Sequence, residues 1–530
     1  MFEPLPTPAE MAAWDQAAIK DYGLKAELLM ENAGACAQDA LEQAYGSLQG
    51  ARVLLLAGGG NNGGDAFVLA RRLLDLGALP LVLHTKPKSA YKAEAAYHLD
   101  LARRAGVELA HLPLARAAQI LDAQAQPDVL VDGLLGTGFK GELAPELAGL
   151  INAANRLGQK AFVLALDIPS GLCGTTGLPK PVAVRATLTV AFHAVKLGCA
   201  LPQAAPYVGE LAARSIGLPL AATQAAPAGQ LLMTGDLLEL AKAPPADLHK
   251  GKAGHVLVIG GSEGLTGAAQ LCGLGALRAG AGLVTLACPR GVLPEIKAAM
   301  PDLMALPLGP VCAKQWSPAC LEELLPHLSR FDAVVLGPGL GRNAEAAAFL
   351  AQFAAAFAQN FSVDFGKAWA PPCIIDADAL FHLAHSPKLM AELPKNAVLT
   401  PHPGEMARIL GMGMGELQAD RPTAARRFTQ AHPQVLALKG AGTLVGQNGL
   451  LHLCAIAAPN LAVGGSGDVL AGVMAACLAR GIAPLAAACL GVYWHALCGA
   501  RLACEFPGRG NLPTEIAHTL PLVLKERTQC

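Results

Sequence analysis

The chain has 530 residues, of which 53% are hydrophobic and 15% charged, and its net charge is −1. This composition is typical of densely packed globular proteins and excludes an intrinsically disordered chain. The near-zero charge and the lack of basic runs argue against a nucleic-acid or polybasic membrane surface. Because the length exceeds what one compact core accommodates, we expect two or three domains.

The cysteines and the N-terminus bear on the compartment. The 14 cysteines form no C-x-x-C pair and lie mostly in apolar segments, as reduced core thiols of a cytosolic protein do. The first residues, MFEPLPTPAE, show neither a basic region nor an apolar segment, which argues against a secretory signal. We therefore expect a cytoplasmic protein. The apolar composition further leads us to expect a homo-oligomer, a tetramer or higher.

The first half of the chain alternates strand and helix patterns. Thr7-Pro8-Ala9-Glu10 is a capping box with proline at the first helical position, which predicts a helix to about Tyr22. A second helix is predicted over residues 27–44. Strands are predicted at 53–57, 79–84, 129–132, 162–167 and 186–192. This order predicts an α/β domain over residues 1–222, with a mostly parallel sheet covered on both faces.

The second half repeats this organisation. Residues 215–235 carry no charge but contain prolines and glycines, so the segment is a poor membrane span and a better linker, placed at 223–231. A second α/β domain is predicted over residues 232–530. Its strands are expected within residues 255–262, 282–289, 332–341, 373–380, 397–405 and 435–446. Residues 351–372 indicate an extended helix and loop without chemistry.

The segment GGGNNGGDAF, residues 58–67, follows the first strand and matches the G-x-G-x-x-G dinucleotide fingerprint. A dehydrogenase should have an acid about 20 residues further on, where this chain has Thr85, Lys86 and Lys88. These lysines could meet a 2′-phosphate, so hydride transfer remains an alternative. Glycines and helix amides suit a phosphate, and Asn62 offers an oxygen to a hard cation. Asp65 is either a ligand-binding residue or a helix cap.

Two further strand ends have the same character. VDGLLGTGFKGEL, residues 131–143, contains Asp132, and ALDIPSG, residues 165–171, contains Asp167 and Ser170. Ligands of open parallel sheets bind beyond the carboxyl ends of the strands. We therefore expect these loops and the segment 58–67 to form one site.

Together, MENAG, GGGNNGGD, VDGLLGTG and DIPSG resemble the N-terminal half of the bifunctional NAD(P)H-hydrate repair enzymes, over about residues 8–220. The resemblance implies a Rossmann-like three-layer NAD(P)HX epimerase domain. Implied hydrate-binding residues are Asn61, Asn62, Gly63, Gly64, Asp65, Gly136, Thr137, Gly138, Phe139, Lys140, Gly141, Glu142 and Asp167. Implied potassium ligands are Asn62, Asp132 and Ser170. Asp167 is our candidate acid/base for inversion at C6. Lys196 either faces the same cleft or is a surface lysine.

Strand-end motifs also gather in the second half: GPGLG (337–341), IDADAL (375–380), TPHPGE (400–405), LKGAGTLV (438–445) and GGSGDVLAG (464–472). The glycines before Asp468 predict an anion hole at a helix N-terminus, with Asp468 as a base on a substrate hydroxyl or as a helix cap. The segment is not a P-loop. His402 is a ligand residue or a packed strand-end histidine. We interpret Asp376 and Asp378 as helix caps.

This motif series resembles the C-terminal ADP-dependent NAD(P)HX dehydratase of the same family, over about residues 232–525, and implies a ribokinase-like fold. Implied hydrate contacts are Ala268, Gly339, His402 and Asp468. Implied contacts to the adenine nucleotide are Lys439, Gly440, Ala441, Gly442, Thr443 and Gly467. The implied chemistry is phosphorylation of the C6 hydroxyl by ADP with Mg²⁺, followed by elimination, giving AMP and phosphate.

Two alternatives to a repair enzyme are open at this point. One is a ribokinase-like small-molecule kinase with an N-terminal dinucleotide-binding module, which GGSGD alone does not exclude. The other is a non-enzymatic binding module, against which the combination of Asn62, Asp132, Asp167 and Ser170 argues.

Overall fold

The computed structural model describes residues 1–241, 245–358, 362–363, 367–368 and 371–528. They form two compact units, Pro4–Gln230 and Met1–Glu3 together with Leu231–Cys530. Part of the predicted linker, 223–230, thus belongs to the first unit. Trp14 Nε1 donates a hydrogen bond to Ala226 O (2.6 Å), and Gly229 N donates one to Glu10 Oε1 (2.9 Å). The end of the predicted segment 351–372 lies partly outside the described residues.

The first unit contains a seven-stranded sheet in the order β4-β3-β2-β5-β6-β7-β8, paired in parallel throughout. The strands are β2 Arg52–Ala57, β3 Leu79–His84, β4 Glu108–His111, β5 Val129–Gly133, β6 Phe162–Leu166, β7 Leu188–Phe192 and β8 Glu210–Arg214. The five predicted strands are confirmed. The edge strands β4 and β8 were missed, because they are half exposed and lack the apolar runs by which buried parallel strands are recognised.

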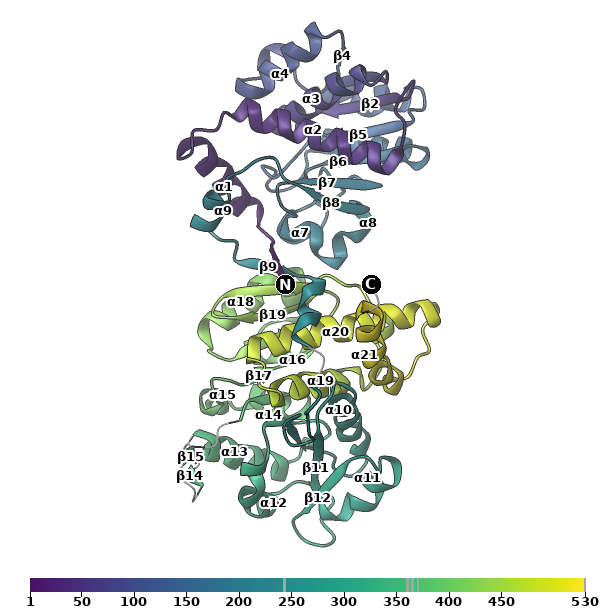
Figure 1. The fold of residues 1–530 in the computed structure, drawn as a ribbon. Coiled ribbons are helices and arrows are strands. Elements are labelled where there is room, and N and C mark those ends of the chain that lie inside the picture. Colours follow the sequence, from purple (N-terminus) through teal and green to yellow (C-terminus); the bar gives the residue numbers. More distant parts are fainter. Residues whose placement is uncertain (242–244, 359–361, 364–366, 369–370, 529–530) are drawn as a thin grey trace. The chain divides into compact units, whose positions relative to one another are not determined.

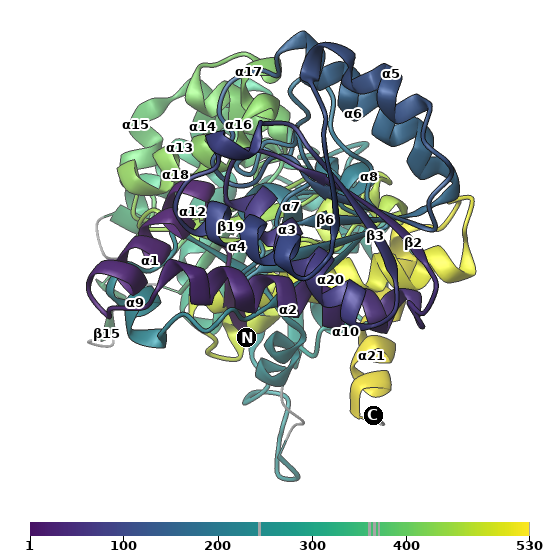
Figure 2. The same ribbon diagram turned by 90° about the horizontal axis from the view of Figure 1, so that it is seen from above.

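Helices cover both faces of this sheet. They are α1 Pro8–Lys20, α2 Ala26–Tyr45, α3 Asn61–Asp75, α4 Ala93–Arg104, α5 Ala117–Asp122, α6 Pro145–Leu157, α7 Leu197–Ala200, α8 Ala205–Val208 and α9 Leu220–Ala225. Alternate residues of β2 enter two separate cores: Val53 and Leu55 pack with α1–α4, whereas Leu54 and Leu56 pack with α5 and α6. Figure 2 shows α5 and α6 side by side, apart from α2. The Thr7–Glu10 capping box is confirmed.

The second unit is built on an eleven-stranded mixed sheet in the order β1-β9-β20-β19-β18-β17-β16-β13-β10-β11-β12. These strands are β1 Phe2–Pro4, β9 Gln230–Met233, β10 His255–Ile259, β11 Leu283–Pro289, β12 Met304–Leu308, β13 Ala333–Leu336, β16 Cys373–Ile375, β17 Val398–Leu399, β18 Val435–Leu438, β19 Thr443–Gln447 and β20 Leu450–Cys454. The strands from β12 to β18 pair in parallel, and β18–β20 are antiparallel. The predicted strand at 435–446 is therefore a hairpin.

The helices of the second unit are α10 Thr266–Arg278, α11 Leu293–Ala299, α12 Pro318–Leu324, α13 Ala344–Ala358, α14 Asp378–His385, α15 Pro387–Glu392, α16 Pro403–Leu410, α17 Met414–Ala419, α18 Arg421–Ala431, α19 Ser466–Ala479, α20 Pro484–Glu505 and α21 Pro513–Thr528. The short pair β14 Ser362–Val363 and β15 Lys367–Ala368 completes the unit (Figure 1). The α/β class predicted for both halves is confirmed.

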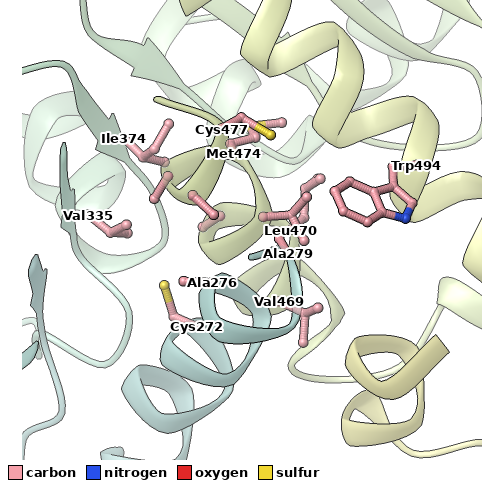
Figure 3. Close-up of a cluster of buried hydrophobic side chains, with 14 of the residues drawn as sticks. Cys272, Ala276, Ala279, Val335, Ile374, Val469, Leu470, Met474, Cys477 and Trp494 are labelled. Atoms are coloured by element: carbon pink, nitrogen blue, oxygen red, sulfur yellow. The ribbon is translucent and has the colours of Figure 1, made fainter. Parts of the chain in front are cut away.

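Helices α10 and α19 pack closely in the core of the second unit (Figure 3). A Cβ on Gly472 would lie 2.0 Å from Cys272 O, and one on Gly275 would lie 2.5 Å from Val469 O. These two glycines therefore let the helix backbones touch, which fixes the position of the first turn of α19. Among the described helices α20 alone has the length and composition of a membrane span, and 72% of its apolar window is buried inside the protein.

Candidate functional sites

A cavity of about 740 Å³ lies in the first unit at the carboxyl ends of β2, β5 and β6. The sequence-predicted residues that line it are Asn61, Asn62, Asp65, Gly136, Thr137, Gly138, Phe139, Lys140 and Asp167. Lys196 also lines it, so the interpretation as a surface lysine is wrong: the residue is 1% exposed. Gly63, Gly64, Gly141 and Glu142 are not among the lining residues.

The glycines of the first loop have different neighbours. A Cβ on Gly63 would lie 2.0 Å from Gly58 O, and a Cβ on Gly64 would lie 2.4 Å from Met30 Sδ. Both glycines therefore pack α3 against neighbouring segments. Gly60, by contrast, has open space around its Cα and lines the cavity. The backbone approach that the motif predicts is available at Gly60.

Asp132 and Ser170 form a buried hydrogen-bonded pair between the ends of β5 and β6. Ser170 donates from Oγ to Asp132 Oδ1 (2.6 Å) and from its amide to Asp132 Oδ2 (2.7 Å). Burial raises the pKa of Asp132 to about 6, although the hydrogen bonds from Ser170 oppose this. Leu135 N donates to Ser170 Oγ (2.8 Å), which ties the third loop to the second.

Asn62 belongs to the same cluster. Its Nδ2 donates to Leu135 O (2.7 Å), whereas its buried Oδ1 has no hydrogen-bond partner among the described residues. A buried acceptor left without a donor is costly, so a cation beside Oδ1 would complete its coordination. No cluster of three or more His, Cys, Asp or Glu with metal-binding geometry occurs in the described part of the chain. The donor set here is instead amide, hydroxyl and carboxylate oxygen, which suits a hard monovalent cation.

Charged groups concentrate on the cavity wall. Lys196 forms a buried ion pair with Asp167 and donates to Phe192 O (2.8 Å). Asp65 is 8% exposed, and burial together with the nearby Asp167 and Asp15 raises its pKa well above the usual range. Asp65 is not the cap of α3, because Gly60 occupies the N-cap position. The cavity thus combines an ion-paired carboxylate with carboxyls whose burial favours the neutral acid.

In the second unit the predicted motifs meet along one edge of the sheet, at the carboxyl ends of the parallel strands β10, β13, β16, β17 and β18. Ser262 N, after β10, donates to Gly339 O (2.7 Å), and Lys439 N, after β18, donates to Pro401 O (2.9 Å). A Cβ on Gly339 would lie 2.4 Å from Leu265 O, which accepts a hydrogen bond from Ala268 N. Neighbouring loops therefore contact one another along the whole rim.

Asp468 lies in the first turn of α19, beside the amides that lack acceptors within the helix. Lys439 faces the same turn, because a Cβ on Gly467 would lie 3.3 Å from its Nζ. Burial, with the like charge of Asp376, raises the pKa of Asp468 to about 7. Such a carboxyl is poised to exchange a proton near neutral pH. It makes no capping hydrogen bond, so the helix-cap interpretation is wrong.

The predicted capping roles of Asp376 and Asp378 are also wrong. Asp376 is buried and accepts from Lys439 Nζ (2.7 Å), and Asp378 accepts from Gly341 N (3.0 Å) and Arg342 Nε (2.7 Å). The first turn of α14 has no side-chain cap. Asp376 belongs to the charged cluster around Asp468, which the sequence did not reveal because its partner lies 63 residues away.

His402 and Arg421 support the rim. His402 Nδ1 accepts from Gly404 N (3.0 Å) and Glu405 N (3.3 Å), so this histidine caps α16 while its ring stays half exposed. Arg421 donates to Leu438 O (3.2 Å) and Lys439 O (3.1 Å), and also to Ala441 O. It thereby shapes the β18–β19 turn, which contains Lys439, Gly440, Ala441 and Gly442, with Thr443 opening β19. No motif in the sequence pointed to Arg421.

Two family descriptions match this chain. NAD(P)H-hydrate dehydratase matches residues 256–522, and YjeF-related protein N-terminus matches residues 26–198. The bifunctional NAD(P)H-hydrate repair enzyme of Moorella thermoacetica is 36% identical over 531 residues, which are 98% of this chain and 96% of that protein. The enzyme with the same description from Escherichia coli is 33% identical over 95% of this chain and 90% of its own.

Solved structures resemble the second unit more distantly. A ribokinase-like superfamily protein from Enterococcus faecalis gives a TM-score of 0.45 at 24% identity and covers 56% of this chain and 96% of its own. An ADP/ATP-dependent NAD(P)H-hydrate dehydratase from Bacillus subtilis, co-crystallised with ATP and Mg²⁺, gives 0.43 at 26% identity, with 55% and 96% covered. On the nearly full-length identity to the curated enzymes, this chain belongs to the bifunctional NAD(P)H-hydrate repair enzyme family.

Proposed function

We propose that the cavity of the first unit epimerises NADH and NADPH hydrated at C6, and that the rim of the second unit dehydrates the S epimer with ADP. Family membership supports both activities on one chain. The observation that carries the site assignment is the cavity itself, where Asn62, Asp65 and Asp167 meet. A cavity of about 740 Å³ is within the range of small-molecule sites.

In the epimerase site, the residues of the loops after β2 and β5 hold the hydrate. The α3 N-terminus, with Asn61 and the open Gly60, suits the diphosphate. Asp167 exchanges a proton at the hydrated ring, and Lys196 holds this carboxylate in place. Gly63, Gly64, Gly141 and Glu142 would then act from behind the cavity wall.

Potassium is the cation that we assign to Asn62, Asp132 and Ser170. The unpartnered Asn62 Oδ1 supports this assignment. When bound, the ion supplies positive charge beside the negative diphosphate. Asp132 must be ionised to contribute, and a cation would favour this by opposing the effect of burial on its pKa.

In the dehydratase site, Ala268, Gly339, His402 and Asp468 surround the hydrate, and Asp468 removes the proton of the C6 hydroxyl. That oxygen takes the terminal phosphoryl group of ADP, and phosphate then leaves far more readily than hydroxide. Lys439 to Thr443 and Gly467 hold the nucleotide, whose phosphates Mg²⁺ accompanies. The first turn of α19 and Lys439 Nζ supply positive potential for the transferring group.

The direct test supplies purified protein with mixed epimers of the hydrate, with ADP or ATP, and follows the absorbance of reduced nicotinamide. Complete conversion with ADP is expected, and conversion of the S fraction alone would contradict the epimerase activity. We place the protein in the cytoplasm as a homo-oligomer. The free cysteines among the described residues support a reducing compartment, and light scattering after gel filtration measures the oligomer.

A further inference from the structure

Asp15 is a carboxylate in the epimerase cavity that no sequence motif includes. Helix α1 turns one face to the cavity, where Met11, Asp15 and Ile19 follow one another at intervals of four residues. The other two side chains of this row are apolar. Asp15 thus places one carboxylate in an apolar stripe of the cavity wall.

Helix α1 is held firmly against the rest of its unit. Its capping glutamate, Glu10, accepts hydrogen bonds from Gly229 N (2.9 Å) and Gln230 Nε2 (3.1 Å). Trp14, next to Asp15, is 1% exposed and donates to Ala226 O (2.6 Å). The position of Asp15 is therefore set by tertiary contacts on both sides of the helix start.

Several charged groups face Asp15 across the cavity. They are Asp65 on α3, the ion pair of Asp167 and Lys196, and, further along the wall, Glu94 and Lys140. Burial raises the pKa of Asp15 to about 6; Asp167 adds to this shift and Lys196 opposes it. The Asp15 carboxyl forms no hydrogen bond or ion pair with any residue that the structure describes. It is available to a ligand.

Inversion at C6 makes a demand that one carboxylate does not meet. The carbon carries a hydroxyl and is bonded to the ring nitrogen, so the hydroxyl must leave from one face and water must add to the other. A proton is delivered on the first face and removed on the second. Asp167 is ion-paired with Lys196 and suits the removal, because the neighbouring ammonium favours its charged form.

We infer that Asp15 is the second acid/base group of the epimerase, paired with Asp167. Asp15 gives its proton to the C6 hydroxyl; the C6–O bond breaks, water leaves with the bonding electrons, and the nitrogen lone pair forms a C6=N double bond. Water adds to the opposite face, the double-bond electrons return to nitrogen, and Asp167 takes the released proton. The reverse reaction exchanges the two roles, and solvent resets them. This inference rests on the proposed epimerase function.

The test is the rate of R-to-S conversion in potassium buffer, with the spontaneous rate subtracted. Asp15→Asn should lower kcat about 10²–10⁴-fold, as loss of an acid/base group does, without raising KM. Dehydration of the S epimer should stay at the wild-type rate. The matched control is Asp21→Asn, which removes an exposed charge at the C-cap of the same helix and should leave epimerisation unchanged.

The pH profile separates proton transfer from a structural role. The two carboxyls must share one proton in either direction, so wild-type kcat/KM should fall as pH rises through about 6. Asp15→Glu should keep a descending limb at a shifted pH, and this variant decides if Asp15→Asn fails to fold. Wild-type kcat in Asp15→Asn, a rise in KM alone, or an Asp15→Glu profile without the limb would overturn the inference. A wild-type protein that epimerises nothing would instead reject the proposed function.

Discussion

The ion pair between Lys196 and Asp167 allows stability and catalysis to be separated by mutation. The Lys196 side chain is 1% exposed and that of Asp167 is 11% exposed. Asp167→Asn removes the countercharge and leaves a buried ammonium with the Phe192 carbonyl at 2.8 Å. Breaking a buried pair in this way costs about 3–5 kcal/mol. We expect the lower end of that range, because Asp167 borders a cavity that water can enter.

In a unit of the size of Pro4–Gln230, each kcal/mol shifts Tm by roughly 2–4 °C. Asp167→Asn should therefore lower the Tm of this unit by on the order of 10 °C, measured by differential scanning calorimetry. It should also lower the epimerisation rate by about 10²–10⁴-fold, through loss of the proton carrier.

The double variant Asp167→Asn/Lys196→Met removes both charges and leaves an apolar stem of similar length. Its Tm should return close to the wild-type value, because replacement of a buried pair by neutral groups is often neutral for stability. Its epimerisation should stay as low as that of the single variant. A double variant as unstable as Asp167→Asn, or a folded Asp167→Asn with wild-type epimerisation, would refute the reasoning.

Asp468→Asn should abolish dehydration, about 10²–10⁴-fold, with epimerisation intact; an unchanged rate of NAD(P)H formation from the S epimer would contradict this. The wild-type dehydration rate should rise with pH through about 7, because the raised pKa keeps Asp468 protonated below that pH. Epimerisation should fall when potassium is replaced by lithium, and Asn62→Ala should remove this dependence; equal rates in both salts would exclude the cation. Gly63→Val should lower Tm because its Cβ meets Gly58 O at 2.0 Å, whereas Gly138→Val, in open space, should fold normally and epimerise more slowly. Equal Tm values for these two variants would contradict the packing account.

Local sequence signals predicted the elements and where their loops meet. The Thr7–Glu10 box and the buried apolar runs gave correct helices and strands, because capping and burial are encoded over a few residues. The glycine and acid motifs were expected at strand ends, and parallel strands bring those ends to one edge. The cavity containing Asn62 and Asp167 follows from that rule.

Tertiary structure alone decided which side chains face one another. Asp376 looked like a helix cap, but Lys439 reaches it from another strand across the sheet. Lys196 could have been exposed, yet Asp167 and the Phe192 carbonyl hold it inside. Asp15 carries no motif, and only the packing of α1 brings it to the cavity. Periodicity specifies the buried face of an element, whereas the partner of a charged side chain depends on which distant elements become its neighbours.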